Sequence, residues 1–170
     1  MLISQTRADL EASRIVGANV TLRDIRLAYI RAQSEPPSLL RVVQNSAPQI
    51  TSKPRIYSLR EENLILPIEL SLKVPNGAAE EFMISIDCTF EADYTVKAGF
   101  EPTQEQLRAF HEANAIFNCW PFFRELVHSF CTRMGHVPIA VPLLRLGLKP
   151  GETSKNNDEK TKVEATISTP

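Results

Sequence analysis

The chain has 170 residues, 43% of them hydrophobic and 23% charged, which is the size and composition of one globular domain with a core of its own. General disorder is excluded. Nineteen Lys and Arg against 20 Asp and Glu give a formal net charge of -1, so the chain as a whole has no strong attraction for nucleic acid or anionic lipid.

No stretch of the sequence approaches the ~20 apolar residues of a membrane-spanning helix. The first residues, MLISQTRADLEASR, also lack the basic-then-apolar order of a secretory signal, so we expect a cytoplasmic protein without membrane insertion. The three cysteines form no CxxC pair, which favours buried free thiols over a disulfide framework or a zinc site. We therefore expect no metal and no cofactor.

Residues 1–19 contain a short amphipathic piece that fits either a leading strand or a short helix. From Val20 onward, apolar residues alternate as in a strand, with a change of phase that predicts a bulge near Arg23 and Asp24. The next segment, residues 33–60, carries four prolines, which exclude a long helix or a central strand. It is apolar for a connection, so its side chains must contact the sheet or a partner.

The clearest strands are two runs of strict alternation, residues 63–74 and 82–96. The Pro-Asn-Gly turn at 75–77 lies between them and predicts an antiparallel hairpin. One face of each strand is apolar and should be buried. The other face of the second strand carries the carboxylates Asp87, Glu91 and Asp93.

The apolar period then changes from two to about 3.6, which predicts helices. Thr103 and Gln106 have capping-box spacing at the start of a first helix. The expected inner stripe of this helix is Leu107, Phe110, Asn114 and Phe117. Pro121 either begins a second helix or kinks a continuing one, and Gly135 supplies the stop.

After Gly135, three prolines predict an extended segment, and residues 150–170 read as a disordered polar tail. The predicted organisation is thus a single domain over residues 1–149.

Two sets of polar residues are candidates for chemistry. His111, His128 and His136 with the cysteines Cys119 and Cys131 are candidates for a small metal-binding domain or an enzyme. Because free cysteines pack as small hydrophobes, we favour a structural role and keep the metal or enzyme site as the alternative of another class. The acidic row of the second hairpin strand fits a solvated sheet face, with contact to a basic partner as the alternative.

The stretch from Asn114 to Leu146 resembles the helix and post-helix segment of the SecB family of protein-export chaperones. In that family an aromatic-Pro-aromatic-x-Arg-Glu junction opens a helix that ends in Arg-x-Gly, and two spaced prolines follow. The matching residues here are Trp120, Pro121, Phe122, Arg124, Glu125, Arg133, Gly135, Pro138 and Pro142. With the earlier strands, the resemblance covers residues 18–146.

The resemblance implies an α+β fold in which a four-stranded antiparallel sheet carries a long C-terminal helix, straight or kinked, on one face. It implies a homotetramer built as a dimer of dimers. The implied function is that of an ATP-independent chaperone, or holdase, which binds unfolded or partly folded proteins in apolar grooves and has no catalytic residues. Burial of about 25 cal/mol per Å² of apolar surface would bind clients without requiring one sequence.

Two sets of site residues follow from the resemblance. The client groove is expected to use the crossing segment and the chain after the helix, at Leu39, Leu40, Val42, Val43, Ile50, Tyr57, Leu143, Leu144 and Leu146. The oligomer interface is expected at Met83, Ser85, Asp87, Trp120, Phe122, Arg124 and Glu125.

Two features depart from the family pattern. Members that act in export are strongly acidic and dock a basic tail of the SecA translocase motor, whereas this chain has a net charge of -1. Members commonly finish with an amphipathic helix, whereas the apolar content here ends at Leu148. The client is therefore either secretory preproteins, with SecA as a further partner, or one labile antitoxin of a toxin–antitoxin pair.

Overall fold

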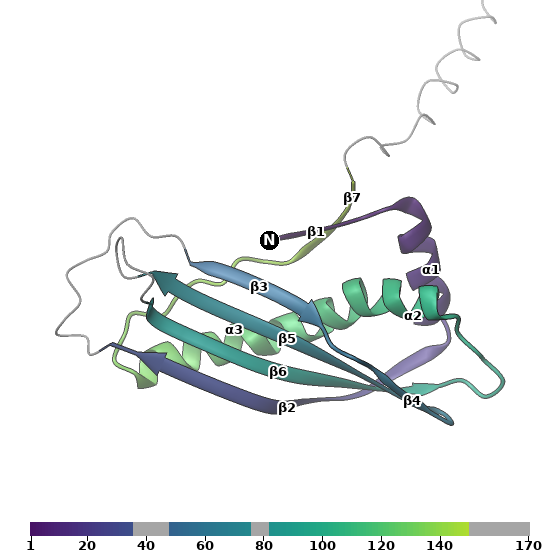
Figure 1. Cartoon of the computed structure of the whole chain (residues 1–170), viewed down its shortest axis with the longest axis horizontal. Coiled ribbons are helices and arrows are strands. Elements are labelled where there is room, and N and C mark those ends of the chain that lie inside the picture. Colours follow the sequence, from purple (N-terminus) through teal and green to yellow (C-terminus); the bar gives the residue numbers. More distant parts are fainter. Residues whose placement is uncertain (36–47, 76–81, 150–170) are drawn as a thin grey trace, which may run out of the picture.

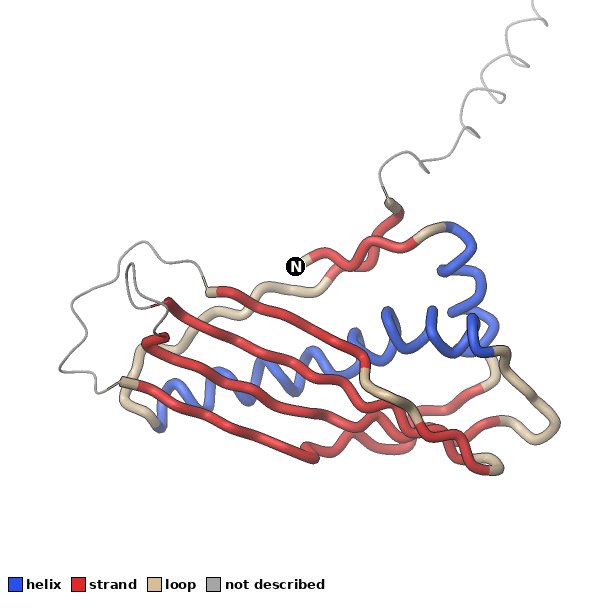
Figure 2. The backbone as a smooth tube through the Cα atoms, in the orientation of Figure 1, coloured by secondary structure: helices blue, strands red, loops and turns tan. Residues whose placement is uncertain are grey.

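The computed structural model describes residues 1–35, 48–75 and 82–149. A sheet of long strands lies across the molecule, and a helical stretch runs along one of its faces (Figure 1). The N-terminal strand and helix lie beside one end of that stretch, where a second, small strand pair forms (Figure 2). The tail predicted over residues 150–170 lies outside the described residues.

The elements follow one another in the order strand, helix, strands, helices, strand. They are β1 (Leu2–Gln5), α1 (Arg7–Gly17), β2 (Val20–Ser34), β3 (Gln49–Pro54), β4 (Ser58–Arg60), β5 (Asn63–Pro75), β6 (Phe82–Val96), α2 (Gln104–Phe110), the π-helical turn η2 (His111–Ala115), α3 (Ile116–Arg133) and β7 (Arg145–Leu148).

The main sheet is antiparallel and has the strand order β2-β6-β5-β3, with the short β4 pairing to β5 beyond β3. The predicted hairpin is confirmed, and Leu70 of β5 lies opposite Cys88 of β6. The predicted bulge is present as a register shift between Leu22 and Asp24 of β2. The fold class expected from the sequence is therefore confirmed, with α1, the fifth sheet strand β4 and the β1–β7 pair as additions.

Part of the crossing segment forms the edge strand β3. This strand begins directly after Pro48 and ends at Pro54. Prolines are tolerated at a sheet edge and at strand ends, because no second neighbour there requires their missing N–H groups. The composition of the segment thus correctly excluded a central strand.

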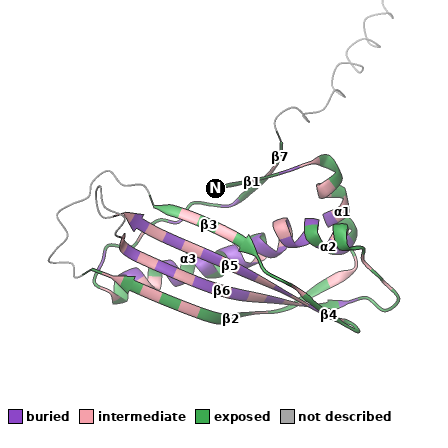
Figure 3. Cartoon of the chain, in the orientation of Figure 1, coloured by how far each residue is buried: buried purple, intermediate pink, exposed green. Residues whose placement is uncertain are grey.

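The core lies between the central strands and the helical stretch. Alternate residues of β5 and β6 are buried (Figure 3), and each of the inner-face side chains is 5% exposed or less. They are Leu64, Leu66, Ile68, Leu70, Leu72, Val74, Ile84, Ile86, Cys88, Phe90, Ala92, Tyr94 and Val96. Each large side chain of this set contributes about 1.5–3 kcal/mol of burial free energy.

The helical stretch changes phase at η2. A π-helical turn contains an extra residue, so the apolar stripe rotates around the axis after it. The placement of Phe117 on the inner stripe is therefore wrong, because its side chain is 48% exposed while Ile116 is 3% exposed. The helix α3 then continues through Pro121 to Arg133.

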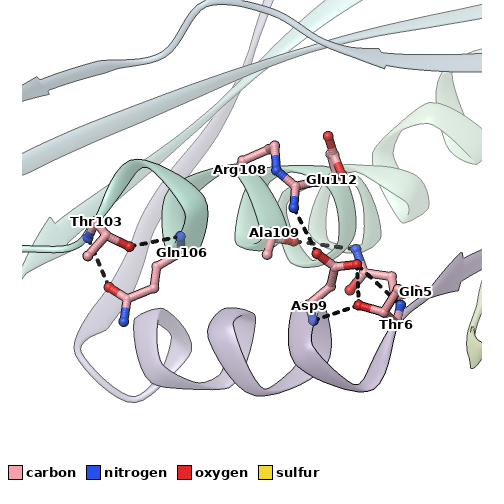
Figure 4. Close-up of polar contacts among 8 residues, drawn as sticks. All are labelled: Gln5, Thr6, Asp9, Thr103, Gln106, Arg108, Ala109 and Glu112. Carbon is pink, nitrogen blue, oxygen red and sulfur yellow. Dashed lines mark hydrogen bonds and ion pairs between the residues drawn. The ribbon is translucent and has the colours of Figure 1, made fainter.

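Two capping boxes begin α1 and α2 (Figure 4). The box predicted at Thr103 and Gln106 is confirmed, with the Gln106 N–H donating to Thr103 Oγ1 at 3.2 Å. The second box was not predicted. In it the Asp9 N–H donates to Thr6 Oγ1 at 3.0 Å, and the Thr6 N–H donates to the Asp9 carboxylate at 3.2 Å. For residues 1–19 the sequence allowed either a strand or a short helix, and the structure contains both, β1 and α1.

Replacing Phe123 with alanine should lower the free energy of unfolding by about 3–5 kcal/mol, because the buried ring packs beside Trp120 with 5.6 Å between ring centroids. The matched control is Phe117→Ala, which removes the same ring from a half-exposed position and should cost about 1 kcal/mol or less. Urea denaturation followed by circular dichroism measures both. Equal losses would contradict the rotated stripe.

Candidate functional site

The junction residues Trp120 and Arg124 hold the extended chain that follows α3, residues 136–149, here named the return segment. Trp120 Nε1 donates to the carbonyl oxygen of Pro142 at 2.9 Å, and Arg124 Nε donates to that of Val141 at 3.0 Å. Extended chain outside a sheet has no neighbouring strand to donate hydrogen bonds to its carbonyl oxygens, so these two side chains supply the donors. The Trp-Pro-aromatic-x-Arg junction therefore fixes the course of the return segment.

Holding the return segment by its backbone leaves leucine side chains exposed along it. Leu143 is 63% exposed and Leu146 is about one-third exposed, whereas Leu144 is buried. Val137, nearer the start of the segment, is also exposed. The segment thus presents apolar surface to solvent while one leucine anchors it to the core.

A cleft opens between the chain after β3 and the helical stretch. It has a volume of about 590 Å³ and is lined by the run Pro54–Tyr57 on one side and by Gln104, Arg108, His111 and Glu112 on the other. The side chain of Ile56 is 94% exposed at this cleft. Tyr57 is half-buried and meets the His111 ring edge to face, with 6.5 Å between ring centroids.

Pro67 of β5 contacts two residues that line the cleft, Arg55 and His111. Its carbonyl oxygen accepts the Arg55 N–H at 2.9 Å, but proline has no N–H with which to return the bond of an antiparallel pair. The same carbonyl oxygen lies 2.9 Å from His111 Nε2, which is therefore the protonated nitrogen of the ring. The edge strand leaves β5 at this point, and β3 gives way to β4.

Burial lowers the pKa of His111, since the ring loses contact with water, and the hydrogen bond to Pro67 opposes that shift. The neutral ring is thus the form that packs against Tyr57 at the cleft wall. His111 belongs to η2, so the extra residue of the π-helical turn is part of what places it there.

Arg108 forms the polar rim of the cleft. Its guanidinium donates to Asp9 of α1 at 2.8 Å and to Glu112 at 2.9 Å (Figure 4). Hydrogen bonding from Thr6, followed by Arg108, lowers the pKa of Asp9. One cation shared by two carboxylates leaves the rim without a strong net charge, and it ties α1 to the wall of the cleft.

The structure places the predicted groove residues in two groups. Tyr57 lies in the cleft and Ile50 is half-buried on β3, while Leu143, Leu144 and Leu146 lie on the return segment. The remaining predicted groove residues, Leu39, Leu40, Val42 and Val43, lie outside the described residues.

Sequence reasoning did not single out Ile56 or Arg108. Ile56 could have been noticed as one more apolar side chain of the segment 33–60, just after Pro54. No sequence signal links Arg108 to Asp9, because the two lie far apart in the chain. His111 was considered as a metal ligand, whereas it packs at the cleft wall.

The residues predicted for the oligomer interface also lie in different parts of the structure. Trp120 is buried in the core of the subunit, and Arg124 binds the return segment. Phe122 and Glu125 are exposed on α3. Ser85 and Asp87 face away from the helices on β6, on what we name the open face of the sheet, whereas Met83 is partly buried against the core. Their role in an interface stays a prediction.

The acidic row of the open face is matched by partners within the described chain. Arg23 of β2 lies 2.6 Å from Asp93, and Arg26 Nε donates to Glu91 at 2.6 Å. Asp87 accepts a hydrogen bond from Ser71 at 2.6 Å. Two carboxylates of the row are thus ion-paired within the subunit, and the third is hydrogen-bonded to a serine, which leaves less unpaired negative charge for a basic partner.

The three cysteines are buried in the subunit. Burial raises the pKa of Cys88 and of Cys119 to about 12, so both are protonated thiols at neutral pH. Within the described ranges, no three His, Cys, Asp or Glu side chains lie together as metal ligands. None of the described helices is long and apolar enough to cross a membrane.

Comparisons with known proteins point to one group. The SecB-like chaperone Rv1957 of Mycobacterium tuberculosis strain H37Rv is 24% identical over 158 residues, covering 80% of this chain and 85% of that protein. The SecB-like chaperone MT2006 of strain CDC 1551 matches with the same identity and coverage. No family model matches the chain.

The solved structure of Rv1957, in complex with a ChAD peptide from the HigA1 antitoxin, matches this fold with a TM-score of 0.70. The sequences of that pair are 20% identical, and the match covers 81% of this chain and 99% of the other. The architecture is thus that of the SecB-like class. With the sequence relatives, this confirms the resemblance to SecB-like chaperones, to which the chain is similar in sequence and in fold.

His111→Gln should make stability less dependent on pH. Because folding lowers the pKa of His111 below its ordinary 6.5, the unfolded chain takes up the proton first as pH falls. The native protein should then lose free energy of unfolding below pH 6.5, by at most about 1.4 kcal/mol per pH unit from this group. Glutamine can still donate to Pro67 without titrating.

Urea denaturation at pH 7.5 and 5.5 measures the effect, with the exposed His128→Gln as the matched control. The control should keep the native pH dependence. A native dependence in His111→Gln would contradict the assignment.

Proposed function

We propose that the protein is an ATP-independent chaperone that binds extended, apolar segments of unfolded or partly folded proteins. The observation that carries the proposal is the unsatisfied apolar surface on the cleft and the return segment. Ile56 and Leu143 are largely exposed on backbone that hydrogen bonds hold in place. The likeness to SecB-like chaperones in sequence and fold supports the proposal.

The mechanism relies on burial of apolar side chains. Each exposed Ile or Leu that a client covers contributes about 1.5–3 kcal/mol, and no particular client sequence is needed. Backbone held by Trp120, Arg124 and His111 lowers the ordering cost on the chaperone side. The proposal uses no nucleotide, metal or catalytic group.

Assembly as a homotetramer, a dimer of dimers, belongs to the proposal. Exposed apolar side chains on the helix-facing side of the edge strand β2, Leu22 and Leu27, and on α3, Phe117 and Phe122, support such contacts. Several copies of the cleft along one client would raise its apparent affinity through effective concentration.

We favour a dedicated client, such as the antitoxin of a toxin–antitoxin pair, over preproteins delivered to the SecA motor. The paired carboxylates of the open face argue against docking of a basic motor tail. The relative Rv1957 binds a ChAD peptide from an antitoxin. The proposal places the protein in the cytoplasm, where such a client is made.

Ile56→Asp should weaken client binding about tenfold or more, because it places a charge where apolar surface must be buried. Ser58→Asp adds the same charge at an exposed position two residues away and should bind as the native chain does. The probe is fluorescein-labelled, reduced and carboxymethylated α-lactalbumin, and fluorescence anisotropy gives the affinity. No binding by the native protein would contradict the proposed function.

The client class can be read from copurification out of the cells that make the protein. The proposal expects one small protein, encoded beside the chaperone, in stoichiometric amount after mild lysis and mass spectrometry. A spread of signal-bearing preproteins would instead indicate a role in export and would contradict the dedicated client.

A further inference from the structure

The strand pair β1–β7 stands apart from the main sheet (Figures 1 and 2). The two strands are parallel, with Ile3 opposite Leu146, and they come from opposite ends of the described chain. The Arg145 N–H donates to the carbonyl oxygen of Met1 at 3.0 Å, and the Lys149 N–H donates to that of Gln5 at 2.9 Å. One edge of the return segment is thus covered by the N-terminal strand.

β1 binds this edge as an extended apolar peptide would. Its backbone pairs with β7, and its residues Leu2 and Ile3 are apolar. Gly147 of β7 leaves room for the Leu2 side chain, since a Cβ atom built at Gly147 would lie 3.1 Å from Leu2 Cδ1. These are the interactions by which a sheet edge recognises any extended segment: main-chain hydrogen bonds and pockets for alternate side chains.

The hold on β1 is weak. The strand has only four residues and pairs with a single neighbour, so few backbone hydrogen bonds hold it. Leu2 remains 59% exposed. Gln5 is buried, yet its amide donates to the Ala109 carbonyl over a long 3.5 Å and its Oε1 atom has no hydrogen-bond partner in the described chain. A buried acceptor without a partner destabilises the bound strand, which favours its release.

The helix that follows is held much better. The capping box of Thr6 and Asp9 closes its first turn, Asp9 pairs with Arg108, and Val16 is fully buried in the core (Figure 4). When β1 leaves β7, it therefore stays tethered at Thr6. A tethered strand returns at a high effective concentration once its site is vacant.

The strand pair also adjoins the cleft. Gln5 contacts Ala109 of α2, and the neighbouring Arg108 lines the cleft. The cleft and the β1–β7 pair therefore contact the same helix, α2.

We propose that β1 is a tethered strap that covers the client-binding edge of β7 and that a client displaces it to pair with β7 in its place. This inference rests on the proposed chaperone function and names how its site is regulated. The strap protects the apolar return segment when no client is bound, and it makes clients compete with a segment of the chaperone.

A reversible cross-link tests the strap directly. The variant Ile3→Cys with Leu146→Cys places two cysteines at register partners on adjacent strands, about 4.8 Å apart between Cα atoms, which suits a disulfide. The native cysteines are buried. The probe is again labelled, reduced and carboxymethylated α-lactalbumin, which has no free thiol. The oxidised variant should bind it at least tenfold more weakly than the same variant after reduction.

A second pair of variants tests release without a disulfide. Ile3→Glu should free β1 and strengthen probe binding about threefold or more, because Ile3 packs against the core. Ser4→Glu adds the same charge at the next, exposed position and should leave binding unchanged.

Equal binding by the oxidised and reduced forms, or weaker binding by Ile3→Glu, would overturn the strap while leaving the chaperone function standing. Absence of probe binding by the native chain and by every variant would overturn the chaperone function itself.

Discussion

The packing of β5 and β6 against the helical stretch is the constraint on which the rest of the structure depends. Their strict alternation buries one face completely, and the helices cover that face alone. The edge strands β2 and β3 flank this core and receive less cover, so apolar side chains there remain accessible. A subunit closed at its centre and open at its margins is suited to binding other chains with apolar side chains.

The return segment shows how a few polar contacts present apolar surface to solvent. Trp120 and Arg124 bind carbonyl oxygens rather than side chains, so they hold the segment without requiring that all of its leucines be buried. Leu144 serves as the anchor, and its neighbours remain free for contact. The aromatic-Pro-aromatic-x-Arg-Glu junction, which carried the family resemblance, thus has a structural reason: its arginine and tryptophan are the donors.

Local patterns were sufficient for the hairpin, the bulge in β2, the capping box at Thr103 and the extended return segment. Each depends on neighbouring residues only. The π-helical turn was not predictable, because nothing in the residues 111–115 distinguishes it from a regular turn, and it moved Phe117 from the core to the surface. The sequence predicted only part of the cleft lining, because the contacts of Arg108 with Asp9 and of His111 with Pro67 depend on long-range packing.

Beside the cleft, at Pro67, the backbone pairing between the sheet edge and β5 changes. Between the pairs Pro54–Ile68 and Ser58–Ile65 the edge of the sheet has one residue more than β5, and Pro67 has no amide hydrogen with which to continue the pairing. The opening is thus determined by backbone chemistry, while the side chains on its walls are free to differ in size and character. Because the cleft does not depend on the side chains that line it, those side chains can be substituted without closing it. The same fold can thereby be adapted to bind polypeptides of different sequence.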